Sequence, residues 1–386
     1  MYAVIAALGL IAWAAADDRA DAVRLADVVA SHFKAWDLDQ DGRISAREID
    51  VLMTRPSIRG EAAAALAVLK ERERAMPANA RSEFEVGADQ VEFLDSIGSH
   101  PVAYDAANGE LGPFRSEAHF KHNLAVLRTL TPRLYAGDGP NFKVMKQGPI
   151  GDCYFFCLVG SVAARDPNRI WRMIQPGPEG SYDVHFPNGE TFNVSAPTEA
   201  EMIVNNSASS LEDGYWLCVL EKALGERMRE TRLPFQRTPE PTDAMASGGT
   251  PDLVINLFSG HLAERVLLSE LAQTPDWMDR VRAELRQVVA DGRLATATVM
   301  APPPGRPKIP GIAYRHAYAV LGYDPDHDLV TLWNPWGNDF QPKGPEGEIY
   351  GFKRVHGVFK IPFPVLYREF TALHLETTRL AIHEAR

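Results

Sequence analysis

The segment from Gln147 to Phe156, QGPIGDCYFF, most constrains the fold, because it gathers the features of a nucleophile around one cysteine. Gly and Pro fill the loop before Asp152, and the apolar run that follows ends at an Asp-Pro step, residues 166–167. We therefore expect Asp152 to be an N-cap and Cys153 to lie in the first helical turn. The unpaired N–H groups and the positive dipole end there favour a thiolate, which attacks carbonyl carbon. The alternative is an inert, buried cysteine.

A second stretch, HAYAVLGYDPDHDLVTLWNPWG, provides a base for that thiol. It predicts a hairpin with strands at 316–321 and 329–333 around a turn at 324–326. His316 and Asn334 are then equally far from the turn and on one face, with Cβ atoms about 5 Å apart. An asparagine carbonyl that accepts from one imidazole nitrogen leaves the other nitrogen to face the thiol. Taken alone, His316 has the alternative of a histidine satisfied inside a sheet.

Together these motifs resemble the cysteine, histidine and asparagine motifs of the calpain family of papain-like thiol proteases. The similarity extends to YWLCVLEKALGERM, to SGGT and to HGVFKIPFPVLYREFTALHLE, and covers roughly residues 110 to 380. The resemblance implies a Cys153–His316–Asn334 triad that hydrolyses protein or peptide substrates. It further implies that Gln147 contributes to the oxyanion hole and that the Trp336 indole shields the histidine–asparagine pair.

Some positions depart from the family pattern. Tyr154 stands where the family usually has Trp, and Arg315 stands where it usually has Gly. Calpain cores bind calcium, but an Asp-Gly-Glu expected before the last aromatic strand is His-Gly-Val here, residues 356–358, and an expected Asp is Val144. Imidazole and aliphatic side chains are poor ligands for a hard cation. We therefore expect this core to bind calcium weakly or not at all.

An EF-hand pattern precedes the protease motifs, with the loop DLDQDGRISARE at residues 37–48 between two expected helices. Hard oxygen donors at this spacing suit Ca²⁺. The sequence therefore predicts calcium as the cofactor. The predicted ligands are the side chains of Asp37, Asp39, Asp41 and Glu48, the backbone carbonyl of Arg43 and, through water, Ser45, with Gly42 at the turn.

A degenerate second hand follows the calcium loop. We expect a helix over 61–72, an extended segment at 84–86 and a helix over 89–97. The segment lacks the Asp-x-Asp pattern, so it is predicted to pair with Ile44 of the first hand without binding an ion.

The N-terminus carries an uncharged run of fourteen residues, 3–16, which is too short to span a bilayer. It reads as an export signal cleaved before Asp17, although positive residues ahead of the run are missing. The protein is then secreted or periplasmic if the leader is a signal peptide, and otherwise cytoplasmic. A buried N-terminal helix is the alternative.

Composition limits the remaining possibilities. The chain has 386 residues, 45% of them hydrophobic, and a formal charge of −11, which argues against nucleic acid as a partner. Three cysteines give no disulfide framework, and Cys157 and Cys218 are expected to be buried. We expect no stable membrane span, and nothing in the sequence indicates an oligomeric state.

The predicted fold class is α+β: a two-lobed, papain-like protease core with one helical and one antiparallel β lobe, behind a small all-α EF-hand domain. The expected divisions are a signal peptide at 1–16, an EF-hand domain at 17–100, a linker at 101–140, a cysteine lobe at 141–240 and a histidine–asparagine lobe at 241–380. The predicted function is a calpain-like cysteine endopeptidase. The rivals are a transglutaminase-type acyl transferase, which usually pairs its histidine with Asp, and a calcium-binding scaffold or adhesion protein with an inactive protease fold.

Overall fold

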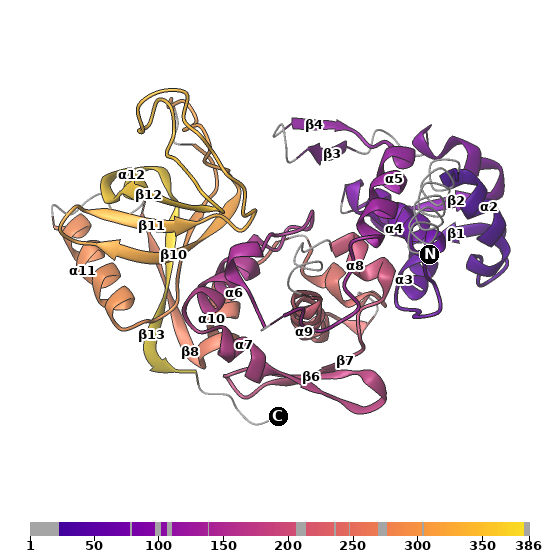
Figure 1. Ribbon diagram of the computed structural model, residues 1–386, viewed down its shortest axis with the longest axis horizontal. Helices are drawn as coiled ribbons and strands as arrows, with labels where there is room; N and C mark the ends of the chain where they lie inside the picture. The colour runs from indigo at the N-terminus through magenta and orange to yellow at the C-terminus, as the bar shows by residue number, and fades with distance from the viewer. Residues whose placement is uncertain are drawn as a thin grey trace, which may run out of the picture. The chain divides into compact units, whose positions relative to one another are not determined.

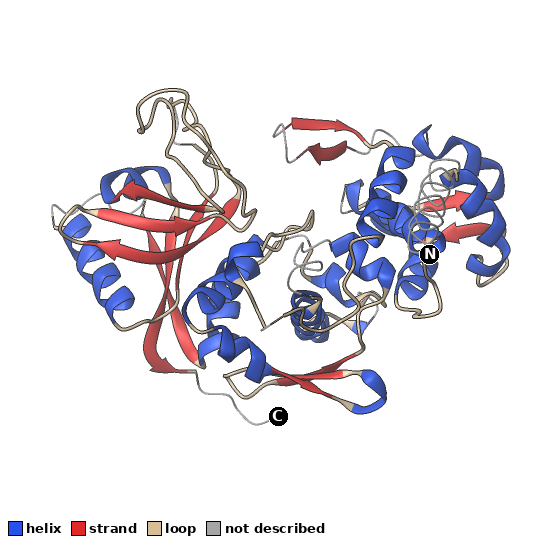
Figure 2. Cartoon of the chain, viewed as in Figure 1, coloured by secondary structure: helices blue, strands red, loops and turns tan. Residues whose placement is uncertain are grey.

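A computed structural model describes the chain in two compact units, and each is treated by itself (Figures 1 and 2). The first unit comprises residues 1–130, 197–206 and 233–240, and the second comprises 131–196, 207–232 and 241–386. The residues that the structure describes are 23–77, 79–96, 102–105, 110–137, 139–205, 214–234, 237–246, 248–268, 276–302 and 305–381. The expected signal peptide at 1–16 lies outside these residues.

The first unit is mainly helical. Its elements are α2 Leu25–Trp36, β1 Arg43–Ser45, α3 Ala46–Met53, α4 Glu61–Ala75, η1 Arg81–Glu83, β2 Glu85–Gly87, η2 Ala88–Ser96, β3 Val102–Asp105, β4 Glu110–Pro113, α5 Ser116–Leu127 and α8 Glu199–Asn205. The segment predicted as a linker therefore contains a helix, α5, that belongs to this unit.

The expected pairing of Ile44 with the extended segment at 84–86 is confirmed. Strands β1 and β2 are antiparallel, with Ile44 opposite Val86, and both side chains are fully buried. The last predicted helix of the second hand is wrong in type, because η2 is a 3-10 helix interrupted at Phe93, whose φ and ψ are non-helical. The two strands hold both loops to one another, which is how helix–loop–helix pairs share a core.

Residues 197–206 belong to the first unit although they lie within the predicted cysteine lobe. The Thr198 hydroxyl donates to the Met53 carbonyl at 2.6 Å, at the end of α3, and the Glu199 carboxylate accepts from Gly60 N–H at 2.7 Å. The apolar face of α8 is buried in the same core as α4. The first unit therefore includes a segment from beyond the boundary predicted at residue 140, and no local sequence pattern indicates this.

The second unit combines helices with an antiparallel sheet. Its elements are η3 Phe142–Val144, α6 Cys153–Arg165, α7 Pro167–Met173, β5 Ile174–Pro176, η4 Pro178–Gly180, β6 Tyr182–His185, β7 Thr191–Val194, α9 Trp216–Glu230, η6 Pro241–Ala244, α10 Pro251–Ser259, β8 His261–Leu267, α11 Trp277–Ala290, β9 Ala295–Val299, β10 His316–Asp324, β11 Leu329–Trp333, β12 Val358–Pro362, α12 Phe363–Glu369 and β13 Ala372–Leu380. Mixed helix and antiparallel sheet is the predicted class for a protease core.

The six-stranded sheet has the order β12-β11-β10-β9-β13-β8 and is covered on both faces (Figure 1). Ala317 and Ala319 of β10 face the core shared with α6 and α10, whereas Tyr318 and Val320 face the core shared with α11. A strand buried on both sides needs apolar residues at every position, and β10 supplies them. None of the helices in the described ranges is long and apolar enough to span a bilayer.

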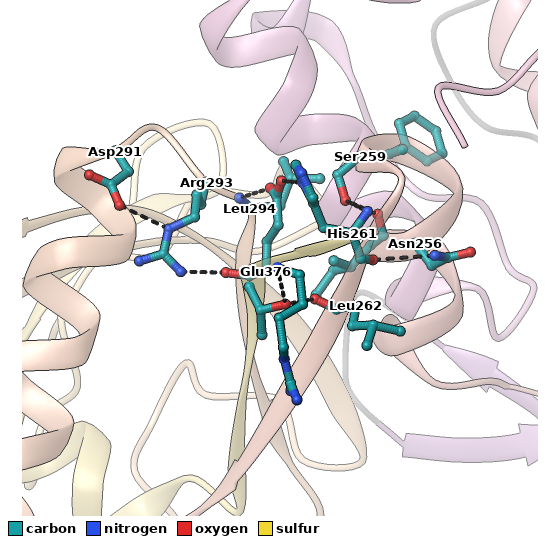
Figure 3. A network of polar contacts seen from close by, with 12 residues as sticks. Asn256, Ser259, His261, Leu262, Asp291, Arg293, Leu294 and Glu376 are labelled. Atoms are coloured by element: carbon teal, nitrogen blue, oxygen red, sulfur yellow. Dashed lines mark hydrogen bonds and ion pairs between the residues drawn. The ribbon is translucent and has the colours of Figure 1, made fainter. Parts of the chain in front are cut away.

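A polar network fastens three strands at one end of this sheet (Figure 3). The Glu376 carboxylate on β13 contacts His261 Nδ1 on β8 at 2.7 Å and accepts from the Leu294 N–H, just before β9, at 2.7 Å. Arg293 donates to the Glu376 carbonyl at 2.6 Å. The carboxylate thus links β8 to the segment just before β9. These two strands lie on either side of β13 and do not pair with each other.

Candidate active site

Cys153 is the first residue of α6, as predicted, and is half-buried. Asp152 occupies the N-cap position, but its side chain makes no capping hydrogen bond, so that part of the expectation is wrong. The Asp152 carbonyl accepts instead from the N–H groups of Phe155 and Phe156, at 2.8 and 3.0 Å. The helix start is therefore formed by backbone geometry.

Two glycines allow α6 to approach its neighbours. A Cβ on Gly160 would lie 2.3 Å from the Trp333 ring of β11, and one on Gly249 would lie 2.5 Å from the Tyr154 ring. Only a residue without a side chain permits such contacts. The cysteine helix thus packs directly against the strand that leads to Asn334.

His316 and Asn334 are joined as the sequence predicts. His316 Nε2 lies 2.9 Å from Asn334 Oδ1. The same oxygen accepts from the Trp336 N–H at 3.1 Å, which identifies it as the amide oxygen. Nε2 therefore carries the proton and Nδ1 is an acceptor. The Trp336 ring lies 4.6 Å from the imidazole, centroid to centroid, in agreement with a shielding indole.

The register of the hairpin differs from the simple symmetric one. Strands β10 and β11 pair antiparallel, but a bulge lies between Val320 and Gly322, and Ala319 is opposite Trp333. Extending that register places Asn334 opposite Tyr318, two residues from His316. The side chains still meet, because diagonal neighbours on one face remain within reach.

The thiol lies beside the histidine strand, because the backbone N–H of Ala317 interacts with Cys153. Burial raises the pKa of Cys153 to about 11, and the Asp152 charge adds to the rise. The hydrogen bond from the Ala317 N–H lowers this pKa but does not cancel the effect of burial. Burial also lowers the pKa of His316 to about 4, although the Asn334 hydrogen bond opposes it, and the Arg354 charge adds to the fall. Burial therefore disfavours the charged form of both groups.

Gln147 lies close to the start of α6. Its Nε2 donates to the Ile150 carbonyl at 2.8 Å, and its backbone N–H donates to the Pro335 carbonyl at 2.8 Å. Its Oε1 is buried without a hydrogen-bond partner. The amide N–H groups therefore point along the loop that ends at the thiol, and Nε2 has a second hydrogen to donate.

Arg315, which stands where the family usually has Gly, has a backbone conformation typical of glycine. The residue is exposed and has φ +56°, a left-handed conformation that favours glycine. The backbone before the histidine therefore keeps a glycine-like conformation despite the larger side chain.

The predicted calcium loop has the geometry of a carboxylate site. Ligand oxygens of Asp37, Asp39 and Glu48 lie within 4.8 Å of one another. Glu48 Oε1 accepts from Leu38 N–H at 2.5 Å, and Asp37 Oδ2 accepts from Gly42 N–H at 2.9 Å. These hard oxygens fit Ca²⁺.

Asp41 and Ser45 are held by local bonds. Asp41 Oδ1 accepts from the Arg43 N–H at 2.8 Å. Ser45 and Glu48 form a capping box at the start of α3. The bidentate position of the loop is thereby tied to the exit helix.

The segment at 356–358 binds the backbone and neighbour of Asn334. Asn334 N–H donates to the Gly357 carbonyl at 2.8 Å, and Trp333 Nε1 donates to the His356 carbonyl at 3.1 Å. Where the family has calcium ligands, this chain therefore has a turn that binds the asparagine backbone. Val144, the other replaced ligand position, lies in η3.

Sequence reasoning missed Asn338 and Arg354. Asn334 Nδ2 donates to Asn338 Oδ1 at 3.4 Å, and Arg354 Nε donates to the Asn338 carbonyl at 2.8 Å. Asn338 follows the recognised NPWG motif, which was the available signal. Arg354 has no sequence signal, because an isolated arginine in a loop is ordinary.

Comparisons with known proteins agree with this geometry. Residues 124–345 match the model of the family described as calpain family cysteine protease. Over 224 residues the chain is 26% identical to "Calpain-type cysteine protease DEK1" of Zea mays, covering 55% of this chain and 10% of that protein. It is 24% identical over 242 residues to "Calpain-5" of Mus musculus, covering 53% of this chain and 36% of that protein.

The matched region is more than half of the chain, so the chain belongs to the calpain family of cysteine proteases, and it includes the predicted triad positions Cys153, His316 and Asn334. It spans about a tenth of the plant relative's length and about a third of the mouse relative's.

Proposed function

We propose that the protein is a cysteine endopeptidase that uses Cys153, His316 and Asn334. The observation that carries the proposal is the 2.9 Å contact of His316 Nε2 with Asn334 Oδ1, which directs proton transfer to Nδ1. Burial disfavours both charged forms, so we expect the ion pair to form as the substrate is attacked.

In the reaction, His316 Nδ1 takes the Cys153 proton as sulfur bonds to the peptide carbonyl carbon. The Cys153 N–H and Gln147 Nε2 hold the oxyanion. The C–N bond then breaks, and the imidazolium protonates the departing amine. Water attacks the thioester with His316 as base, which releases the acid and restores the thiol.

A calcium-binding scaffold with an idle protease fold is the second candidate, and the raised pKa of Cys153 favours it. The test is labelling with a thiol-directed epoxide together with cleavage of unfolded casein. We expect Cys153→Ala to remove both signals. Labelling confined to Cys157 or Cys218, without cleavage by the parent, would establish the scaffold. Cys157 is the matched control, because it is buried on the same helix and burial raises its pKa well above the ordinary value.

The calcium proposal assigns one Ca²⁺ to the loop at 37–48. The clustered carboxylates of Asp37, Asp39 and Glu48 support it. Its effect is expected on the first unit, by mass action on folding. Calorimetric titration of the full chain with Ca²⁺ tests this, and unaltered heats in Glu48→Gln would contradict it.

Export is a further proposal, which rests on the apolar run at 3–16 alone. N-terminal sequencing of secreted or periplasmic protein should begin at or near Asp17. A mature chain that begins at Met1 would show that the run is retained.

A further inference from the structure

The loop between Asn334 and β12 folds around one buried arginine. Arg354 is 5% exposed, and it forms an antiparallel bridge with Phe340, with N–H to carbonyl distances of 3.0 and 2.9 Å. Its guanidinium donates to the Asn338 carbonyl through Nε at 2.8 Å and to the Gly311 carbonyl through Nη1 at 2.6 Å. One side chain thus joins the segment after the catalytic asparagine to the loop before the catalytic histidine.

Aromatic rings complete the surroundings of this cation. The guanidinium carbon lies 5.8 Å from the centre of the Phe340 ring and 6.0 Å from that of Phe359. A Cβ on Gly311 would lie 2.8 Å from the Phe340 ring, so the ring fills the space between the two loops. Cation–π contact and two carbonyl acceptors stabilise the guanidinium.

The carboxylate that acts on this cation through its charge is that of Asp339. Within the described parts of the chain, no Asp or Glu oxygen forms a salt bridge with Arg354. Burial lowers the pKa of its guanidinium, but an arginine stays protonated in proteins. Burying a cation without a salt bridge costs free energy, and a neutral residue would avoid that cost. Arg354 thus lowers the stability of the fold through the burial of its charge, and it lies next to the His316–Asn334 pair.

A short path leads from Arg354 to the histidine. Asn338 receives the Arg354 hydrogen bond on its carbonyl and the Asn334 amide on its side-chain oxygen, at 3.4 Å. Asn334 in turn contacts His316. We propose that Arg354 is a positioning residue that holds the Asn334–His316 pair in its catalytic arrangement by fastening the loops on either side of it. This inference rests on the proposed peptidase function.

The same cation acts on the imidazole through its charge. The groups that contact or act on His316 are Tyr318 on its own strand, Asn334 and Trp336 from the next loop, and Arg354, while Cys153 of α6 lies beside the neighbouring Ala317. Of these, Arg354 is the permanent cation, and it disfavours the imidazolium. Removing it should raise the pKa of His316, whereas a residue that only stabilises the loop, without acting on the Asn334–His316 pair, would leave the imidazole titration unchanged.

The experiment compares Arg354→Met with Arg293→Met in the full chain. Arg293 is a matched control, because its side chain is also largely buried, at 13% exposed, and also donates to a backbone carbonyl, that of Glu376 (Figure 3). It lies just before the first residue of β9, whereas His316 pairs with Val299, the last residue of that strand. The His316 titration is followed by NMR on histidine-labelled protein, with the signal assigned by its loss in His316→Ala. Peptide hydrolysis gives kcat and KM.

We expect Arg354→Met to move the His316 titration to higher pH and to lower kcat about 10- to 100-fold at nearly constant KM. Arg293→Met should leave the titration and kcat at parental values. An unmoved titration in Arg354→Met, or a kcat equal to that of Arg293→Met, would overturn the proposal.

Two further readouts keep the outcome decisive. If Arg354→Met does not fold, Arg354→Lys keeps a cation but lacks the fork that reaches both carbonyls, so kcat should still fall, and an unchanged kcat would refute the positioning role. If the parent chain has no peptidase activity, the peptidase function fails, while the titration shift still tests the contact of Arg354 with the catalytic pair.

Discussion

The loop at 37–48 in the first unit and the loop at 334–358 in the second handle charge in opposite ways. In the first, oxygens of Asp37, Asp39 and Glu48 lie within 4.8 Å of one another, so like charges repel until a cation is bound. In the second, the Arg354 guanidinium binds backbone carbonyls of two segments. Under the calcium proposal, the first loop takes its cation from solution, whereas the second carries its cation on a side chain. The two proposals can therefore be tested separately.

The largest expected effect comes from changing the proposed base, His316, or its partner Asn334 at the start of the second loop. His316→Ala should lower kcat/KM by about 10⁴-fold or more, because the base is lost, and Asn334→Ala should be about 10- to 100-fold milder, because it only misorients the base. Steady-state hydrolysis measures both, and Ca²⁺ binding at the first loop should stay at the parental affinity. Equal kinetics for Asn334→Ala and the parent would show that the 2.9 Å contact is irrelevant to catalysis.

The next effect breaks the first loop. Glu48→Gln should abolish the calcium-dependent rise in stability, which for the parent is about 2.7 kcal/mol at a hundred times Kd. Thermal unfolding with and without chelator measures it. Hydrolysis by the parent in chelator should remain within about twofold, since Arg354 needs no ion.

The full chain is the appropriate protein for that comparison. Residues 197–206 pack in the first unit, so removing residues before 101 would expose the apolar face of α8. Full loss of hydrolysis on chelation, restored by Ca²⁺, would show that the core has calcium sites of its own.

A smaller effect concerns pH. The pKa of His316 is lowered by burial from 6.5 to about 4, against the Asn334 hydrogen bond and with the Arg354 charge adding to the fall. A depressed pKa means that His316 contributes stability that is present above pH 6.5 and is lost as pH falls towards about 4. Denaturant unfolding should show that the parent loses about 2 kcal/mol more between pH 7 and 5 than His316→Gln does. Identical losses would indicate that the imidazole is not buried as described.

The smallest expected effect tests whether Arg43 binds calcium through its backbone carbonyl. Arg43 is predicted to bind Ca²⁺ through its carbonyl, while its side chain forms an ion pair with Glu85 at the surface. Arg43→Gln should change stability by less than about 1 kcal/mol and leave calcium affinity nearly unchanged. A large loss of affinity in calorimetric titration would show that the side chain, rather than the carbonyl, matters.

Local sequence determined the elements whose signals lie within a dozen residues. The proposed ligands of the loop at 37–48 could be predicted, because their spacing is a property of one loop, and the loop at 148–152 precedes a helix that starts at Cys153. The pairing of Ile44 with Val86 was also predictable, since an apolar extended segment needs a partner.

Tertiary structure decided the features that depend on residues far apart. The bulge after Val320 sets the register of the hairpin of His316 and Asn334, and burial shifts the pKa values of the thiol and the imidazole. Helix α8 joins the first unit from within the protease sequence. Arg354 acquires its place only when the loops at 311 and 338 meet around it. The physical reason is that desolvation and long-range packing depend on what surrounds a residue in space, and the chain encodes those surroundings in segments that no local pattern connects.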